Sequence, residues 1–93
     1  MSFAGIAFEA AMTPDQARKL ARLMEEGRST RPEGVVTALL EYRDGRGRLL
    51  AVWRDRGTLD AYLATADVPR GTELMRKVGL EPEVTISDAL DLR

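Results

Sequence analysis

The sequence predicts an α+β fold in which helices cover one face of an antiparallel sheet. Three observations predict it: a capping motif followed by helical spacing, an Asp-Gly pair between two apolar runs, and the order strand, helix, strand, strand, broken helix, strand. The 93 residues fit one domain, residues 1–93. A domain this short buries only about two thirds of the surface of its unfolded chain. Without cysteines to form disulfides, we expect oligomerisation to add stability.

The first two elements are a strand over residues 2–11 and a helix over residues 13–27. Strand periodicity places one set of side chains together: Ala4, Ile6, Phe8 and Ala10. Thr13 is a good N-cap, Pro14 suits the first helical position, and Gln16 completes a capping box. Gly27 ends the helix. The inward stripe at helical spacing is Ala17, Leu20, Ala21 and Met24.

A β-hairpin is predicted at the turn Asp44-Gly45, between residues 35–43 and 48–55. One face of the hairpin carries Val36, Ala38, Leu40, Tyr42, Leu49, Ala51 and Trp53, and the other carries Val35, Thr37, Leu39, Leu50 and Val52. Both faces are apolar, whereas a sheet with one wet face alternates apolar with polar residues. Helices of this chain can cover only one face. We therefore expect a second copy of the chain to cover the other.

The C-terminal third predicts a helix opening at Gly57-Thr58, an interruption at Pro69, a second helical piece ending at Gly79, and a final strand over residues 84–92. This βαββαβ order is the ferredoxin-like pattern.

Composition excludes several classes of function. The chain has no Cys, His or Asn, so zinc sites built from Cys or His, thiol nucleophiles and His-based triads are ruled out. The net charge of −1 disfavours a nucleic-acid binder, and the third strand offers only Trp53 as a stacking aromatic. No segment is long and apolar enough to span a membrane, and no signal peptide is evident, so a cytoplasmic protein is expected.

The stretch 50–63 (LAVWRDRGTLDAYL) resembles the antibiotic biosynthesis monooxygenase-like (ABM) group of dimeric α+β barrel proteins. In that group the third strand ends in an apolar run and Trp, a polar pair follows, and a helix then presents an aromatic residue or His. The element order agrees over nearly the whole chain. The resemblance implies a homodimer in which two sheets form a barrel, with no cofactor and no metal.

The resemblance also implies an activity: cofactor-independent oxidation of an aromatic or polyketide-like small molecule. The candidate ligand-pocket residues are Phe8, Trp53, Tyr62 and Met75, and no catalytic residue is assigned. Active members use Asn, Trp and, where they degrade haem, a His ligand. The corresponding positions, near 6–8, at Tyr62 and near Thr72, do not match. The alternative is a non-catalytic small-ligand-binding or interaction module with the same fold.

Charge is unevenly distributed near the hairpin and the C-terminus. The hairpin carries Arg43, Arg46, Arg48, Arg54 and Arg56, and the last segment carries Glu81, Glu83, Asp88, Asp91 and Arg93. These are either two solvated surfaces or complementary ones. In the second case the acidic last strand of one subunit lies against the basic hairpin of the other.

Overall fold

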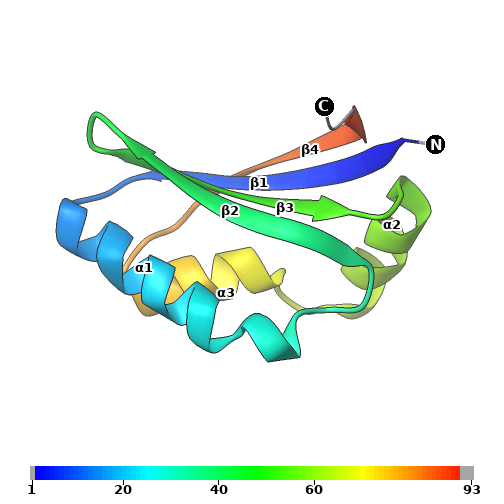
Figure 1. Ribbon diagram of the computed structural model, residues 1–93, viewed down its shortest axis with the longest axis horizontal. Helices are drawn as coiled ribbons and strands as arrows, with labels where there is room; N and C mark the ends of the chain where they lie inside the picture. The colour runs from blue at the N-terminus through cyan, green and yellow to red at the C-terminus, as the bar shows by residue number, and fades with distance from the viewer. Residues whose placement is uncertain (1, 91–93) are drawn as a thin grey trace.

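The computed structural model describes residues 2–90, which contain four strands and three α-helices in the predicted order (Figure 1). The strands are β1 (Phe3–Ala11), β2 (Val35–Arg43), β3 (Arg46–Trp53) and β4 (Glu83–Leu90). The helices are α1 (Pro14–Glu26), α2 (Arg56–Thr65) and α3 (Arg70–Lys77), and a 3₁₀ turn spans Arg28–Thr30. Leu92, expected in the last strand, lies outside the described residues.

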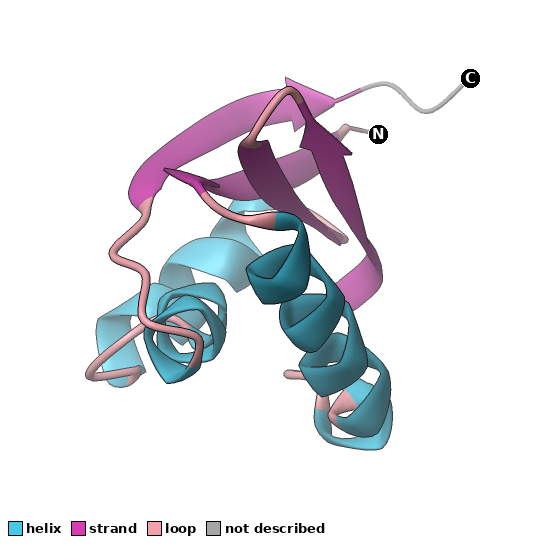
Figure 2. Ribbon diagram, turned by 90° about the vertical axis from the view of Figure 1, so that its left-hand side faces the viewer, coloured by secondary structure: helices cyan, strands magenta, loops and turns pink. Residues whose placement is uncertain are grey.

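The strands form one antiparallel sheet in the order β2-β3-β1-β4. All three helices lie on the same side of this sheet, as Figure 2 shows. We call this the helix side, and the opposite side the open face. The predicted ferredoxin-like α+β architecture is therefore confirmed.

The core lies between the sheet and the helices. The β1 residues predicted to share one face are all buried there: Ala4, Ile6, Phe8 and Ala10. Trp53 from β3, Leu20 from α1, Leu59 from α2 and Met75 from α3 complete the centre.

Helix α1 begins as predicted. The Gln16 backbone N–H donates to the Thr13 hydroxyl at 3.1 Å, and the Thr13 backbone N–H donates to Gln16 Oε1 at 2.9 Å. Gln16 also donates from Nε2 to the Val78 carbonyl at 3.0 Å, which ties the start of α1 to the end of α3. Ala21 was predicted to face inward but is exposed, because the buried stripe is narrow and centred on Ala17 and Leu20.

The hairpin turns through two residues, since β2 ends at Arg43 and β3 begins at Arg46. Asp44 and Gly45 have φ values of 52° and 77°. Two positive φ angles characterise the tight turn that matches the right-handed twist of paired strands, and Gly and Asp adopt them at low cost.

One part of the predicted hairpin is wrong. The pairing of β2 with β3 shifts between Val35 and Thr37, so that Val36 is an extra residue in β2. Val35 therefore packs against the core, whereas Val36 is 49% exposed. The alternation of the sequence predicts Val36 on the face of Trp53 and Val35 on the other face. The structure reverses these two positions, because the extra residue of a β-bulge shifts the alternation by one.

The charged groups of the hairpin and the last strand pair within one chain. Arg46 lies 2.6 Å from Glu9 and 3.6 Å from Glu83, and Arg56 forms an ion pair with Asp88. Because β1 lies between β3 and β4, Arg46 of β3 reaches across β1 and pairs with both Glu9 and Glu83. The structure thus gives Arg46 and Arg56 carboxylate partners within the same chain, and the contact between subunits stays a prediction. Asp91 and Arg93 lie outside the described residues.

Candidate functional site

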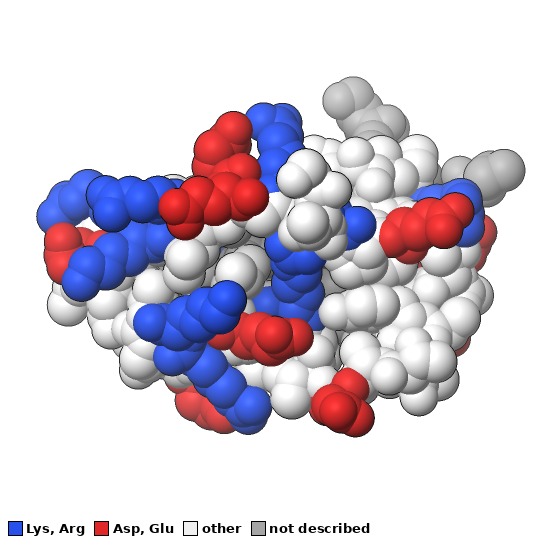
Figure 3. Space-filling model, turned by 90° about the horizontal axis from the view of Figure 1, so that it is seen from below, with Lys and Arg blue, Asp and Glu red and all other residues white. Residues whose placement is uncertain are grey.

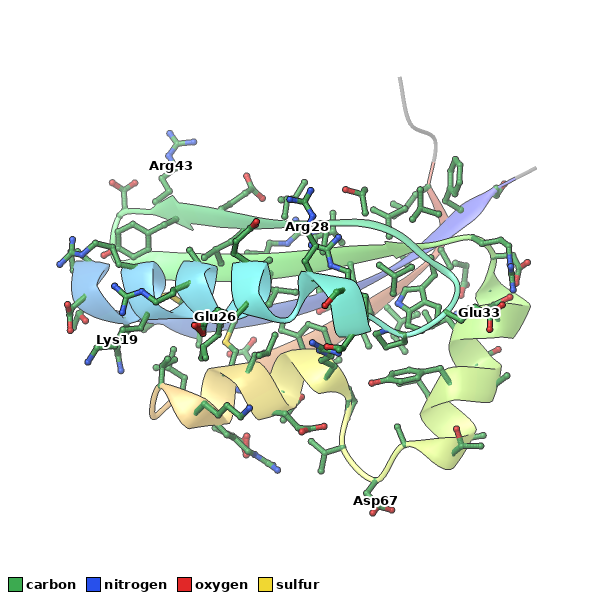
Figure 4. All side chains as sticks on the ribbon, turned by 60° about the horizontal axis from the view of Figure 1, so that its bottom comes forward. Lys19, Glu26, Arg28, Glu33, Arg43 and Asp67 are labelled. Carbon is green, nitrogen blue, oxygen red and sulfur yellow. The ribbon has the colours of Figure 1, made fainter. Side chains whose placement is uncertain are left out.

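A cavity of about 60 Å³ lies between the helix side of the sheet and the ends of the helices. Its wall combines side chains of β1, β2 and β3 with residues of all three helices and of the loop after α1. Figure 4 shows this loop, with Arg28 near its start and Glu33 further along, curving from the end of α1 toward α2. The described lining residues include no carboxylate, imidazole or thiol.

The structure brings together three of the four predicted pocket residues. Phe8, Trp53 and Tyr62 all line the cavity. Met75 does not line it: its side chain is 0% exposed and belongs to the core. Helix α3 faces the cavity with Gly71 and Leu74, which are three residues apart, whereas Met75 is buried in the core cluster.

Trp53 and Tyr62 form the aromatic wall. Their ring centroids are 5.0 Å apart and the ring planes are tilted by 35°, a favourable arrangement for two aromatic rings. The Cε3–Cζ3 edge of the indole faces Gly34, whose missing side chain leaves room for it. The Nε1–H group therefore lies on the other side of the indole.

The Trp53 Nε1–H is buried and has no hydrogen-bond partner among the described residues. A buried donor left without an acceptor destabilises a protein by about 1–3 kcal/mol. Buried polar groups are nearly always paired, so such an exception needs an explanation. Trp53 lines the cavity, although its buried Nε1 atom has almost no accessible surface of its own.

The Tyr62 hydroxyl is oriented by the start of α3. The Arg70 backbone N–H donates to the Tyr62 hydroxyl oxygen at 2.9 Å. The hydroxyl hydrogen has no acceptor within the described part of the chain and remains available. Two residues that line the apolar cavity, Trp53 and Tyr62, thus each carry a donor group without an acceptor in the described part of the chain.

Helix α2, which carries Tyr62, begins at an Asp N-cap. The Thr58 backbone N–H donates to the Asp55 carboxylate at 2.7 Å, and this hydrogen bond holds the pKa of Asp55 below its usual value. The nearby Arg54 guanidinium acts in the same direction. The start of the helix is therefore fixed next to Trp53, at the end of β3.

Arg70 closes one side of the cavity. Its Nη2 donates to the Gly27 carbonyl at 2.8 Å and to the Thr30 hydroxyl at 2.9 Å, and Nη1 donates to the Thr30 carbonyl. The side chain thereby joins the start of α3 to the loop after α1. Arg31, in the same loop, also lines the cavity and is half-buried.

Sequence reasoning missed Arg31, Arg70 and Gly71. Residues 28–34 form a polar stretch between the predicted helix and the predicted hairpin, and no spacing links that stretch to residue 70. One signal was present: both α2 and α3 begin with Arg-Gly-Thr, at 56–58 and 70–72. Gly57 is exposed, whereas Gly71 is buried against the Phe8 ring.

A shallower groove runs along β4 on the helix side, bordered by Val84, Ile86, Arg76 and Glu81. Its two charged residues neutralise each other, with Arg76 Nη2 2.7 Å from Glu81 Oε1. This pair lowers the pKa of Glu81. The groove offers no unpartnered donor among the described residues, which distinguishes it from the cavity at Trp53.

No protein-family model and no curated protein sequence matches this chain, whereas solved structures do. A candidate antibiotic biosynthesis monooxygenase from Bordetella bronchiseptica is similar with a TM-score of 0.69 and 13% identity, over 97% of this chain and 99% of that one. A candidate antibiotic biosynthesis monooxygenase from Chloroflexus aurantiacus is similar with a TM-score of 0.64 and 19% identity, over 99% of this chain and 97% of that one. SnoaB, a cofactor-independent oxygenase from Streptomyces nogalater, is similar with a TM-score of 0.62 and 15% identity, over 99% of this chain and 97% of that one.

The chain therefore has the α+β fold of ABM proteins, as the resemblance predicted. At 13–19% identity these similarities establish the fold alone. Across residues 2–90, no helix combines the length and apolar character needed to cross a membrane.

Proposed function

We propose that this chain is an ABM-type oxygenase that acts on an aromatic or polyketide-like small molecule without a cofactor. The observation that carries the proposal is that two residues lining the apolar cavity, Trp53 and Tyr62, each carry a donor group without an acceptor among the described residues. The similarity to SnoaB supports the reaction class.

The chemistry requires little of the protein. A CH₂ carbon activated by a neighbouring phenol or ketone loses two hydrogens and gains one oxygen atom of O₂, and the second oxygen atom leaves with those hydrogens as water. The substrate supplies all four electrons that reduce O₂. The protein needs to stabilise the substrate oxyanion from which the electrons are drawn, and preorganised donors in a water-poor site do this well.

The absence of a carboxylate or imidazole among the described lining residues restricts the substrate. No such group is there to remove a proton. The substrate must therefore be acidic in its own right, as an enolisable ketone or a polyhydroxylated aromatic is. Hydrogen bonds from Trp53 and Tyr62 to its oxyanion would lower its pKa further.

A second candidate function is a non-catalytic ligand-binding module with the same fold. The observation that favours it is the volume of the cavity, about 60 Å³, which is small beside the roughly 300–1,000 Å³ of pockets that hold drug-sized ligands. The missing Asn favours it too.

Oxygen consumption with a panel of dihydroxyaromatic and anthrone-type substrates tests the proposal. Trp53→Phe and Tyr62→Phe each keep a ring and remove one donor, and we expect each to lower kcat/KM by about 10²-fold. Tyr42→Phe is the matched control, because the Tyr42 hydroxyl donates to the Met12 carbonyl outside the cavity. A panel member that binds but consumes no oxygen would favour the binding module.

We further propose that the chain forms a homodimer through its open face. No helix of the described chain covers that face (Figure 2). Leu39 is 43% exposed there and pairs with Leu50 on β3. Monomeric proteins rarely expose such apolar surface in a continuous patch.

A further inference from the structure

We propose that Arg31 and Arg70 form an anion-binding subsite at the mouth of the cavity, and that the ligand is an aromatic carboxylate. This inference rests on the proposed function only in that the cavity must receive a small molecule. It adds the charge of that molecule and the residues that recognise it.

The first argument is the distribution of charge. Most arginines of the described chain lie in ion pairs with a carboxylate. Within residues 2–90, three arginines have no such partner: Arg22, Arg31 and Arg70. Two of the three line the cavity and are half-buried, while Arg22 is exposed on α1. Viewed from the helix side, basic and acidic side chains are interspersed, with basic atoms at the hollow near the centre (Figure 3).

The second argument is the kind of partner that Arg70 has. Its guanidinium is held by two backbone carbonyls and one hydroxyl, all of them neutral. A carboxylate adds an opposite charge that these neutral partners lack, and a guanidinium matches a carboxylate with two parallel hydrogen bonds. A carboxylate at the mouth can therefore replace the carbonyls of Gly27 and Thr30.

The third argument is the volume. The cavity of about 60 Å³ has room for a few water molecules and not for an aromatic ring system. The Arg70 side chain crosses from α3 to the loop after α1, so an anion that draws Arg70 away from that loop also widens the entrance. A Cβ at position 27 would collide with Arg70 Nη2, and the glycine there leaves the guanidinium its place.

The remaining walls fit the rest of such a ligand. Phe8, Leu49 and Trp53 give an apolar surface for an aromatic ring. The Tyr62 hydroxyl, and the buried Trp53 Nε1–H once a ligand widens the cavity, would donate to a hydroxyl or carbonyl oxygen on that ring. The ligand is therefore a hydroxylated aromatic whose carboxylate lies at the arginines.

Two probes of nearly equal size test the proposal: 1-hydroxy-2-naphthoate and its neutral counterpart 1-hydroxy-2-naphthamide. Binding is measured by isothermal titration calorimetry and by the fluorescence of Trp53, which is the single tryptophan of the chain. We expect the carboxylate to bind at least about tenfold more tightly than the amide, and this advantage to shrink when salt rises from about 20 mM to about 500 mM.

Single substitutions of arginine test whether Arg31 and Arg70 cause the preference for the carboxylate probe. Arg31→Gln and Arg70→Gln should each weaken carboxylate binding by about tenfold and change amide binding by less than about twofold. Arg22→Gln is the matched control, because it removes the same charge from an unpaired arginine away from the cavity, and it should change neither. Arg70→Lys keeps the charge without the paired donors, so this variant should bind the carboxylate with intermediate affinity. Arg70→Lys takes the place of Arg70→Gln in the comparison if Arg70→Gln does not fold.

The outcomes separate the two proposals. Equal affinity for the two probes, or an equal loss in Arg22→Gln, would overturn the anion subsite while leaving the cavity as a small-molecule site. No binding of either probe at millimolar concentration would overturn both. Tight, arginine-dependent binding of the naphthoate would support the subsite, whereas the oxygenase is contradicted only if no member of the substrate panel consumes oxygen, because the naphthoate has no CH₂ carbon to oxidise.

Discussion

At the scale of single residues, the two Arg-Gly-Thr segments show how one local sequence serves two purposes. Gly57 and Gly71 occupy the same position in their helices, one after the first residue. A Cβ on Gly57 would meet only Asp55 Oδ1 at 3.6 Å, an ordinary contact. A Cβ on Gly71 would collide with the Phe8 ring in the cavity wall. Glycine is therefore required for close packing at one helix start and dispensable at the other.

Gly71→Ala should lower the free energy of unfolding by about 1–3 kcal/mol, because the Phe8 ring must move off its preferred packing. Gly57→Ala should be neutral or stabilise the fold by up to about 1 kcal/mol, since alanine favours helix. Urea denaturation followed by circular dichroism measures both. Equal effects of the two substitutions would show that α3 does not pack on Phe8 as closely as the structure indicates.

Asp55 links stability to pH. Its pKa is lowered in the folded chain by the Thr58 backbone N–H, so the charged form stabilises the fold above the pKa of the unfolded state. This contribution is lost as the pH falls below about 4 and through the lowered folded value. Asp55→Asn should therefore melt below the wild type at pH 7, and the gap should narrow toward pH 2.5. A gap that stays constant with pH would contradict the shifted pKa.

At the scale of elements, much of the fold follows from the sequence alone. The capping box at Thr13 and Gln16 and the positive-φ turn at Asp44-Gly45 are local features, and both formed as predicted. The β-bulge at Val36 was not predictable, because it depends on how β2 fits the twist of β3. Met75 was correctly predicted to point inward, but its absence from the cavity wall was not predictable, since helical spacing gives a stripe but not which edge of it faces a cavity.

Some residues of the candidate site could likewise be predicted from the sequence, and others could not. Phe8, Trp53 and Tyr62 lie on regular elements whose inward faces the periodicity indicates. Arg31 lies in a loop, and Arg70 reaches 40 residues back to Thr30. Contacts of that range depend on the packing of α3 beside α1, which no local pattern in the sequence encodes.

The capping box of α1 supports a further test. Thr13→Ala removes the acceptor for the Gln16 N–H and should lower the free energy of unfolding by about 1 kcal/mol. Thr65→Ala serves as the control, because its hydroxyl donates to helix carbonyls that already have partners near the end of α2. A loss in Thr13→Ala no larger than in Thr65→Ala would argue against the cap as a source of stability.

At the scale of the whole molecule, the sheet has two unlike faces, one covered by helices and one open. If the open face is a dimer interface, Leu39→Glu should shift the molecule to a monomer in sedimentation velocity experiments, because a charge would be buried between two copies. Val84→Glu is the matched control: Val84 is 46% exposed but lies on the helix side of β4. A wild type that sediments as a monomer at micromolar concentration would overturn the proposed dimer.

Helices α1 and α3 are joined at both of their ends. Gln16 bonds to Val78 at one end, and Arg70 bonds to Gly27 and Thr30 at the other. If an incoming anion breaks the hydrogen bonds of Arg70 to Gly27 and Thr30, α3 remains bonded to α1 only through Gln16 and Val78. The start of α3 can then move away from the loop after α1 while its end stays in place. Amide hydrogen exchange in Arg70→Gln should then be faster than in the wild type over residues 27–34 and unchanged around Gln16. This result would show that the motion is confined to the side of the cavity where the ligand enters.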